Sequence, residues 1–175
     1  MKSMRLITDR NGFTLIELLI VLTIAAILTF QITPSFARLI QSMRISAAAS
    51  NMERTLRIAR SAALLRRELI RICPSEDGYW CSNNNDWSTG WITYVDQTGE
   101  AIRNPEDIII ATQGPYKAIG IYYNRGGRVS VNALGRITQS GTIRICDRKY
   151  PDNSVNLVMI HSARLKRVNA WESCS

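Results

Sequence analysis

The stretch FTLIELLIVLTIAAILTFQI, Phe13–Ile32, decides the fold, because these twenty residues carry a single charge. A helix of that length rises about 1.5 Å per residue and spans about 30 Å, the hydrocarbon thickness of a bilayer. Lys2, Arg5 and Arg10 precede it, and a cationic flank favours a cytoplasmic N-terminus. The sequence therefore predicts a membrane-spanning helix.

Glu17 is the one charge in this stretch. A carboxylate at the centre of a membrane helix costs about 2.5–3.5 kcal/mol even on permissive scales, so it usually has a partner. A cut after Gly12 would create a new α-amine at Phe13, four residues before Glu17. That amine could neutralise Glu17 of a neighbouring subunit as helices bundle. The alternative is an acid that snorkels to the membrane interface.

The N-terminal pattern also resembles a secretory signal peptide, but it differs in one respect. A signal peptide carries its small-residue cleavage site after the apolar run. Here no A-x-A-like site follows the run, and the small residue Gly12 precedes it. An ordinary single-helix anchor remains as the other alternative.

The string GFTLIEL, residues 12–18, resembles the processing site of type IV pilins and type II secretion pseudopilins. The resemblance implies cleavage of a leader, residues 1–12, by prepilin peptidase, methylation of Phe13, and filament assembly through a helix over 13–34. Pro34 lacks an N–H and should kink or locally unwind this helix. A proline here resembles pilus subunits more than pseudopilins.

Residues 35–71 should continue as an amphipathic helix, since no Gly or Pro occurs there and Ala, Leu, Arg and Met dominate. At 100° per residue its apolar side chains form two stripes. We expect one stripe to face neighbouring subunits and the other to pack in the chain's own domain. The first contains Phe36, Ile40, Met43 and Ala47, and the second contains Ile45, Met52, Leu56, Ala59 and Ala63.

Short β-branched or aromatic runs follow the helix, separated by Gly, Pro, Asn and Asp at turn-like spacing. They are IRIC, GWITYV, DIIIAT, AIGIYY, RVSVN, TIRIC and VNLVMI. This pattern predicts antiparallel strands. The expected fold is α+β and pilin-like: a long N-terminal helix packed on an antiparallel sheet, with residues 35–175 forming one globular domain.

Three of these segments extend the resemblance. CPSEDGYWC (73–81), DWSTGWITYVD (86–96) and GTIRICD (141–147) are similar to the FimT/FimU and GspH family of minor pilins and pseudopilins. Trp87 and Trp91, four residues apart, are interpreted as core residues rather than ligand-binding ones.

Four cysteines suit a compartment outside the cytosol and allow three pairings. Cys73 and Cys81 enclose a tight loop and are the preferred pair, which leaves Cys146 with Cys174. The second bond would fasten the C-terminal tail to the sheet, and each closure could stabilise the fold by about 2–4 kcal/mol. The alternative, a zinc site, is disfavoured because paired C-x₂₋₄-C knuckles are absent from the sequence.

No enzyme motif occurs in the sequence: there is no G-x-S-x-G, Walker loop or H-E-x-x-H. The lone histidine, His161, is expected to be a satisfied strand residue. Asp77, Asp86 and Asp96 form no recognisable acid/base pair. We therefore expect a protein that is not an enzyme and needs no cofactor, metal or small-molecule substrate.

The resemblance implies a minor pilin that helps initiate or cap a type IV pilus; a type II secretion pseudopilin is an alternative. Its expected partners are other minor and major pilins, prepilin peptidase and the pilus assembly platform. The chain should cross the inner membrane once, with residues 35–175 in the periplasm, and then join the pilus at or near the tip.

DNA capture for natural transformation is the other alternative, and the net charge of +8 favours anionic partners. Some FimT-type proteins bind DNA through a C-terminal Gly-Arg-x-Arg motif. The matching stretch here is ARLK (163–166) followed by Arg167, with Ala in place of Gly and Lys in place of the second Arg. The candidate contacts are Arg164, Lys166, Arg167, Arg125 and Arg128.

Overall fold

The computed structural model describes residues 14–82, 84–100, 102–150, 153–162 and 164–170, except for the side chains of 29–35. Helix α1 runs over 52 residues, Leu15–Arg66. Its backbone is helical through Pro34, so local unwinding is not how this chain accommodates the proline. The chain forms two compact units that divide within α1, Met1–Ile40 and Gln41–Ser175, and each is described by itself.

The helix ends earlier than residue 71, where the sequence prediction placed its end. Arg67 takes a left-handed conformation with φ of 58°, and its N–H donates to Ala63 O at 2.9 Å. That arrangement closes the last turn as a C-cap does. Residues beyond it form strand β1, Leu69–Pro74, whose six residues all pair with the antiparallel segment Trp91–Asp96. Tertiary pairing thus overrides the helix-forming composition of the segment.

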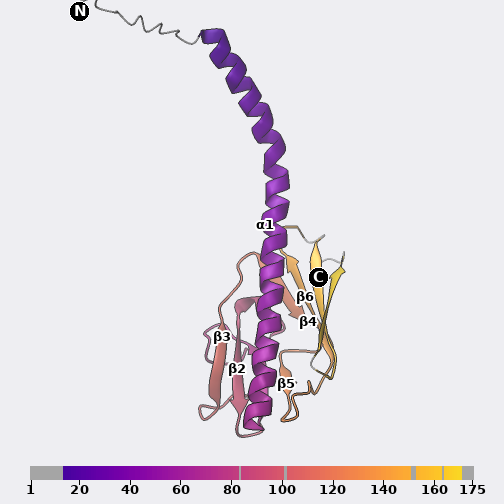
Figure 1. Ribbon diagram of the computed structural model, residues 1–175. Helices are drawn as coiled ribbons and strands as arrows, with labels where there is room; N and C mark the ends of the chain where they lie inside the picture. Colours follow the sequence, from indigo (N-terminus) through magenta and orange to yellow (C-terminus); the bar gives the residue numbers. More distant parts are fainter. Residues whose placement is uncertain (1–13, 83, 101, 151–152, 163, 171–175) are drawn as a thin grey trace, which may run out of the picture. The chain divides into compact units, whose positions relative to one another are not determined.

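The strands form two four-stranded sheets instead of the single expected sheet (Figure 1). The first has the order β3-β2-β1-β5 and the second β4-β6-β7-β8, with every pair antiparallel. The remaining strands are β2 Trp91–Asp96, β3 Ile108–Gln113, β4 Ile119–Tyr123, β5 Val129–Val131, β6 Gly141–Asp147, β7 Ser154–Met159 and β8 Leu165–Ala170.

The seven predicted runs all form strands, which confirms the α+β fold. The sequence does not predict strand β8, because Lys166 and Arg167 give this segment a basic character. His161, which is expected in a strand, lies in the turn between β7 and β8, where its Nδ1 is 3.0 Å from Ile137 O. The expected strand was too long at this point because the chain turns after Met159.

One core joins the helix to both sheets. The stripe expected to pack in the domain is buried: Ile45, Met52, Leu56, Ala59 and Ala63 are at most 3% exposed. Alanines on this face let the sheets approach the helix closely. The stripe expected to face outward is open at Met43, which is 63% exposed, and at Ala47.

Trp87 and Trp91 lie in this core, as the sequence predicted, at 0% and 1% exposure. The Trp91 indole N–H donates to Thr55 Oγ1 of α1 at 3.0 Å, and its ring stacks on Tyr116 with centroids 5.8 Å apart. Trp87 belongs to a short 3₁₀ turn, Trp87–Thr89, and meets Tyr123 edge to face. The two tryptophans therefore connect helix, first sheet and second sheet.

Candidate assembly and interaction sites

The start of α1 is organised by a local cap. Gly12 and Phe13, the expected processing site, lie outside the described residues. Thr14 precedes the helix, and its Oγ1 accepts the backbone N–H of Glu17 at 3.3 Å. Thr-x-x-Glu at this position has the spacing of a capping box, a signal that the sequence analysis missed. Glu17 also lies in the first turn, where a carboxylate complements the helix dipole.

The large apolar side chains of residues 15–28 are all exposed in the isolated chain. They range from Ile24 at 52% to Leu15 at 78% exposed. Within the part of the chain that the structure describes, no helical segment is long and apolar enough to cross a membrane. An apolar surface this continuous is characteristic of a segment that packs against lipid or against other proteins.

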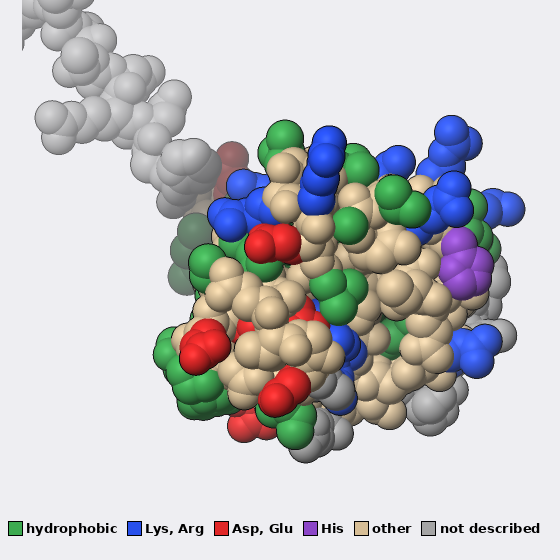
Figure 2. All heavy atoms as spheres, turned by 90° about the horizontal axis from the view of Figure 1, so that it is seen from below, with side chains coloured by type: hydrophobic (Ala, Val, Ile, Leu, Met, Phe, Trp, Pro, Cys, Tyr) green, Lys and Arg blue, Asp and Glu red, His purple; other side chains and the backbone are tan. Residues whose placement is uncertain are grey.

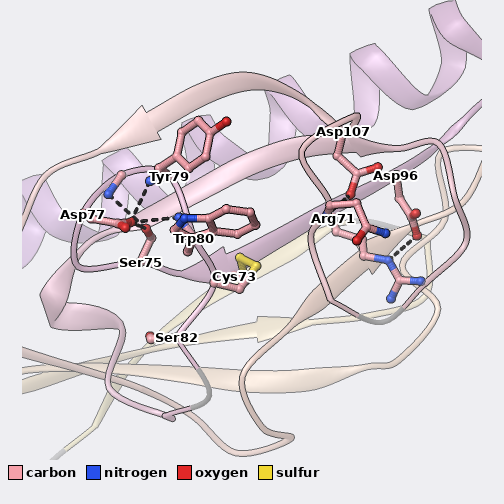
Figure 3. Close-up of a disulfide and its surroundings, with 12 residues drawn as sticks. Arg71, Cys73, Ser75, Asp77, Tyr79, Trp80, Ser82, Asp96 and Asp107 are labelled. Carbon is pink, nitrogen blue, oxygen red and sulfur yellow. Dashed lines mark hydrogen bonds and ion pairs between the residues drawn. A yellow bond between two sulfur atoms is a disulfide. The ribbon is translucent and has the colours of Figure 1, made fainter.

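A disulfide-closed loop covers one end of the outer face of the first sheet (Figure 3). Cys73 and Cys81 are bonded, as the sequence predicted, with their Cα atoms 5.5 Å apart. Inside the loop, Asp77 Oδ1 accepts the N–H groups of Trp80 and Tyr79, each at 2.8 Å. These donors lower the pKa of Asp77 below its usual 3.8, because they favour the charged carboxylate.

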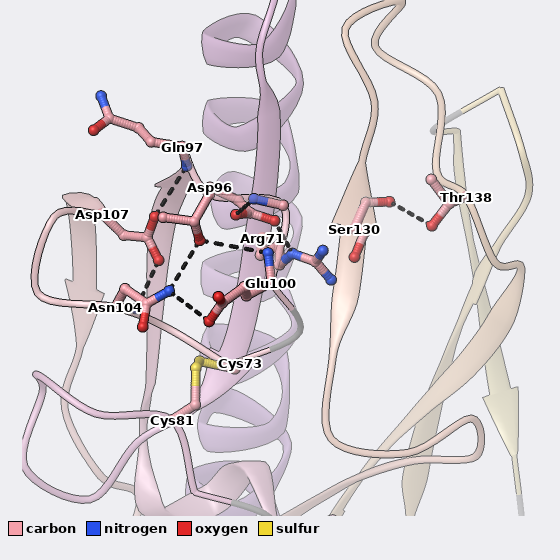
Figure 4. Close-up of polar contacts among 12 residues, drawn as sticks. Arg71, Cys73, Cys81, Asp96, Gln97, Glu100, Asn104, Asp107, Ser130 and Thr138 are labelled. Carbon is pink, nitrogen blue, oxygen red and sulfur yellow. Dashed lines mark hydrogen bonds and ion pairs between the residues drawn. A yellow bond between two sulfur atoms is a disulfide. The ribbon is translucent and has the colours of Figure 1, made fainter.

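A second loop meets the first through Arg103, which is only 3% exposed. Its guanidinium lies over the rings of Tyr79, at 4.2 Å, and Trp80, at 5.2 Å. Its Nη2 donates to Asp107 O at 3.1 Å. The Asp107 carboxylate in turn accepts N–H groups from both ends of the loop, at Gln97 and Asn104 (Figure 4). Nothing in the sequence marked Arg103 as buried.

These two loops shield a small second core. It contains Cys73, Ile92 and Tyr94, all 0% exposed. Burial raises the pKa of Tyr94 to about 12, since its charged form is penalised away from water. Arg71 and Asp96 form an ion pair at 2.5 Å, with the Asp96 side chain fully buried. The outer face of this sheet is therefore a packed structural layer.

The other acids that the sequence analysis considered are also structural. Asp86 caps the 3₁₀ turn by accepting from Ser88 N and pairs with Arg148 at 3.0 Å. Among the residues described, no group of three or more His, Cys, Asp or Glu is placed to hold a metal ion. Cys146 is buried in β6, and its expected partner Cys174 lies outside the described residues.

The five candidate DNA contacts do not form one cluster. Lys166 lies in β8 and Arg164 immediately precedes this strand, and both are exposed. Arg167 lies on the other face, toward α1, where it lines a hollow of about 250 Å³ with Ser42 and Ile45. Strand alternation thus separates Arg167 from its sequence neighbours.

The remaining two candidates differ from each other. Arg125 is exposed, and its side chain lies beside Gly141, at the end of the second sheet that also carries Lys166. Strand β4, which Arg125 follows, and strand β8, which carries Lys166, are three strand spacings apart in this sheet, about 14 Å. Arg128 is half-buried and its Nη1 is enclosed. The structure therefore brings Arg125, Lys166 and Arg164 to one end of a sheet and leaves Arg128 and Arg167 elsewhere.

The sequence model of the family described as type II transport protein GspH matches residues 48–163, more than half of the chain. The chain belongs to the GspH family. A model of the prokaryotic N-terminal methylation motif matches residues 7–30. The GspH-family assignment and this motif together make the chain a minor pilin or pseudopilin.

Solved structures support the same fold for this GspH-family member. The type IV minor pilin FimU of Pseudomonas aeruginosa has TM-scores of 0.57 and 0.58 in two crystal forms, at 19% and 20% identity. Each match covers 75% of this chain and 100% or 95% of FimU. The minor pseudopilin EpsH of Vibrio cholerae has a TM-score of 0.52 at 11% identity, covering 72% of this chain and 97% of EpsH. No curated protein gave a match.

Proposed function

We propose that this GspH-family chain is a structural subunit that helps initiate or cap a type IV pilus, after prepilin peptidase removes residues 1–12 and Phe13 is methylated. The observation that carries the proposal is the difference in burial between two parts of α1. Residues 15–28 expose large apolar side chains, whereas residues 45–63 bury a stripe in the globular unit. One helix thus has one part suited to lipid or a helical bundle and another part committed to its own domain.

The proposal includes a path for the subunit. It is held in the inner membrane with residues 35–175 in the periplasm, and it then enters the pilus at or near the tip. Glu17 pairs with the α-amine of a neighbouring subunit, and residues 13–34, which end at Pro34, form the filament-core helix. Its partners are minor and major pilins, prepilin peptidase and the assembly platform. No catalytic role is proposed, because Asp77, Asp86 and Asp96 are all engaged in structural contacts.

A deletion strain tests the structural role most directly. Loss of surface pili, restored by the wild-type gene, supports it, and the restored protein should begin at methylated Phe13 by mass spectrometry. Gly12→Ala should leave the chain uncut and fail to restore pili. A mature protein that still carries residues 1–12 contradicts the proposal. Normal pili together with defective protein secretion would assign the chain to a secretion pseudopilus instead.

DNA capture is a second candidate, favoured by the exposure of Arg125, Arg164 and Lys166 at one end of the second sheet. Among the described residues, the charged groups of these three take part in no ion pair or hydrogen bond. Each duplex phosphate contact contributes about 0.9 to the salt slope of log affinity. Replacing all three by alanine should therefore lower the slope by about 2 to 3. Arg167→Ala, on the opposite face, is the matched control.

The measurement is a salt titration of full chain with labelled duplex DNA. If the triple variant and the wild type have equal slopes, these three residues do not contact phosphate. If Arg167→Ala alone lowers the slope, the contact lies on the face toward α1. Normal pili together with lost DNA uptake in the deletion strain would favour this second candidate over the structural role.

A further inference from the structure

A groove of about 460 Å³ runs between the second half of α1 and strand β3. Its floor is apolar and consists of Ile58, Ala62, Leu65 and Ile110. A volume of this size falls within the range of sites that hold a ligand group or several side chains. The groove lies wholly within the globular unit, so its geometry does not depend on the membrane-proximal part of the helix.

The apolar floor is unusually open to water. Leu65 is 85% exposed, and Ile108, which begins the adjoining strand, is 44% exposed. The stripe of the same helix that packs in the core, from Ile45 to Ala63, is only 0–3% exposed. A single exposed leucine needs no explanation, but Leu65 adjoins the half-buried Ile58, Ala62 and Ile110 on one concave apolar surface, which indicates a contact site.

The rim of the groove is cationic. Arg54, Arg57 and Arg66 surround the floor, and all three are exposed. Among the described residues, none of the three takes part in an ion pair, and no acid lines the groove. Charge complementarity therefore selects an acidic partner, and the floor requires that partner to carry an apolar side chain as well.

Strand β3 favours an extended partner over a helical one. It is an edge strand, IIIATQ, without a charged residue, and no described strand pairs with its outer edge. One edge strand of the other sheet, β8, carries Lys166 and Arg167, and charged side chains are a common way to blunt such edges. A bulge opposite Thr93 and Tyr94 leaves Ile110 without a partner in β2, and Ile110 lines the groove. Bulges commonly re-aim a side chain toward a functional site.

We propose that this groove receives an extended acidic segment of a neighbouring pilus subunit. One large apolar side chain enters the floor between Ile58 and Ile110, and flanking carboxylates meet Arg54, Arg57 and Arg66. The inference rests on the proposed function, because it requires a neighbouring subunit. Duplex DNA fits less well, since phosphates would use the rim but leave the apolar floor uncovered. A bilayer surface fits less well because the site is concave.

The binding test uses full chain in detergent micelles and two labelled heptapeptides. One alternates glutamate and valine around a central leucine, and its twin has glutamine in place of glutamate. Three exposed ion pairs should make the acidic peptide bind about 3- to 30-fold more tightly than the twin. Arg57→Gln should weaken acidic-peptide binding by about 2- to 5-fold, and Leu65→Ser should weaken both peptides.

Lys117→Gln is the matched control, because it removes one exposed cation just before β4 in the other sheet and should leave binding unchanged. Arg57 and Leu65 are both exposed, so their variants should bind peptide more weakly and still have the circular dichroism spectrum of the wild type. Equal binding of the two peptides, or equal binding by wild type and groove variants, overturns the proposal. The proposal is also overturned if duplex DNA or phosphatidylglycerol vesicles bind in a way that depends on Arg57 and Leu65 while the acidic peptide fails to bind.

A test in the native host separates this inference from the function on which it rests. Arg57→Glu and Leu65→Ser should still be processed but should be incorporated into pili several-fold less than Lys117→Gln. If both groove variants are incorporated normally while Glu17→Val is not, the groove inference fails and the proposed function stands. If the wild-type protein itself is absent from pili, the proposed function fails, and the inference that rests on it fails too.

Discussion

The two parts of α1 belong to one continuous helix and yet differ in how they are buried. Residues 15–28 carry Leu, Ile and Val all round and expose them, whereas residues 45–63 place Ala, Met and Leu on one face against two sheets. An all-round apolar helix needs several neighbours, while a one-sided helix needs one domain. The comparison teaches that a single helix can be committed to its own fold at one end and left for assembly at the other.

The largest effect that can break this comparison comes from the buried part. Replacing Met52, which is 0% exposed, by alanine should lower the unfolding free energy by about 2–5 kcal/mol, because a cavity remains. Leu22→Ala, at a site 59% exposed, should leave the unfolding of the globular unit unchanged. Urea denaturation of full chain in detergent, followed by tryptophan fluorescence, measures both. Equal losses would mean that the two parts of the helix are not distinct.

The disulfide extends the comparison to the face of the first sheet that α1 does not cover. Cys73→Ser with Cys81→Ser should lower the unfolding free energy by about 2–3 kcal/mol, as expected for a short closed loop. The same denaturation experiment measures it. Reducing agent should lower the unfolding free energy of the wild type toward that of the double variant. It should have no effect through this loop in the double variant, which lacks the bond. No difference between the two proteins would show that the outer layer is held by its packing alone.

Glu17→Val sharpens the comparison from the exposed part. It removes the carboxylate proposed to pair with a neighbouring α-amine, so incorporation into pili should fall while unfolding of the globular unit is unchanged. Glu53→Gln, which changes an acid in the domain part of the same helix, is the control and should assemble normally. Quantitative immunoblots of sheared pili measure incorporation. Wild-type incorporation of Glu17→Val would contradict the charge-pairing argument.

A smaller effect is expected at the cap of α1. Thr14→Ala removes the Oγ1 that accepts the Glu17 N–H and should destabilise the first turn by about 0.5–2 kcal/mol. Hydrogen exchange at residues 15–18 should rise, with no change at residues 45–63. Thr14→Ser retains the hydroxyl and should behave as the wild type. Faster exchange along the whole helix would show that its two parts are coupled.

The smallest effect lies in the disulfide loop and depends on pH. The pKa of Asp77 is lowered, so its contribution to loop order is present above the usual value of 3.8 and is lost as pH falls through the lowered pKa. Amide resonances of Tyr79 and Trp80 should therefore shift below pH 3.8 in the wild type. In Asp77→Asn they should not titrate. Matching titrations in both proteins would assign the shift to another group.

The sequence predicted the strands and the buried helix stripe because both depend on local periodicity. It could not predict two sheets, since the order β3-β2-β1-β5 joins residues far apart in the chain. Strand β8 was missed because an exposed edge strand bears charges such as Lys166 and lacks clear alternation. The end of α1 was misplaced because Arg67 is not a glycine, the usual residue in a left-handed cap.

The candidate sites likewise contain features that the sequence can predict and others that it cannot. The Cys73–Cys81 bond could be predicted from its short loop, and the T-x-x-E spacing of Thr14 and Glu17 was readable but overlooked. No sequence pattern predicts the burial of Arg103, since it depends on aromatic rings carried by another loop. The separation of Arg167 from Lys166 required knowledge that the segment is a strand.

The cap at Thr14 bears on the chemistry of the mature terminus. Cleavage after Gly12 would leave one residue, Phe13, ahead of the N-cap. The full charge of its α-amine would then lie next to the half positive charge of the helix end. Two positive centres so close together repel each other, which would weaken the first turn of an isolated subunit. A carboxylate supplied by Glu17 of a neighbouring subunit would relieve this repulsion, so the first turn would gain stability in the filament beyond what the Thr14 cap gives it in the free chain.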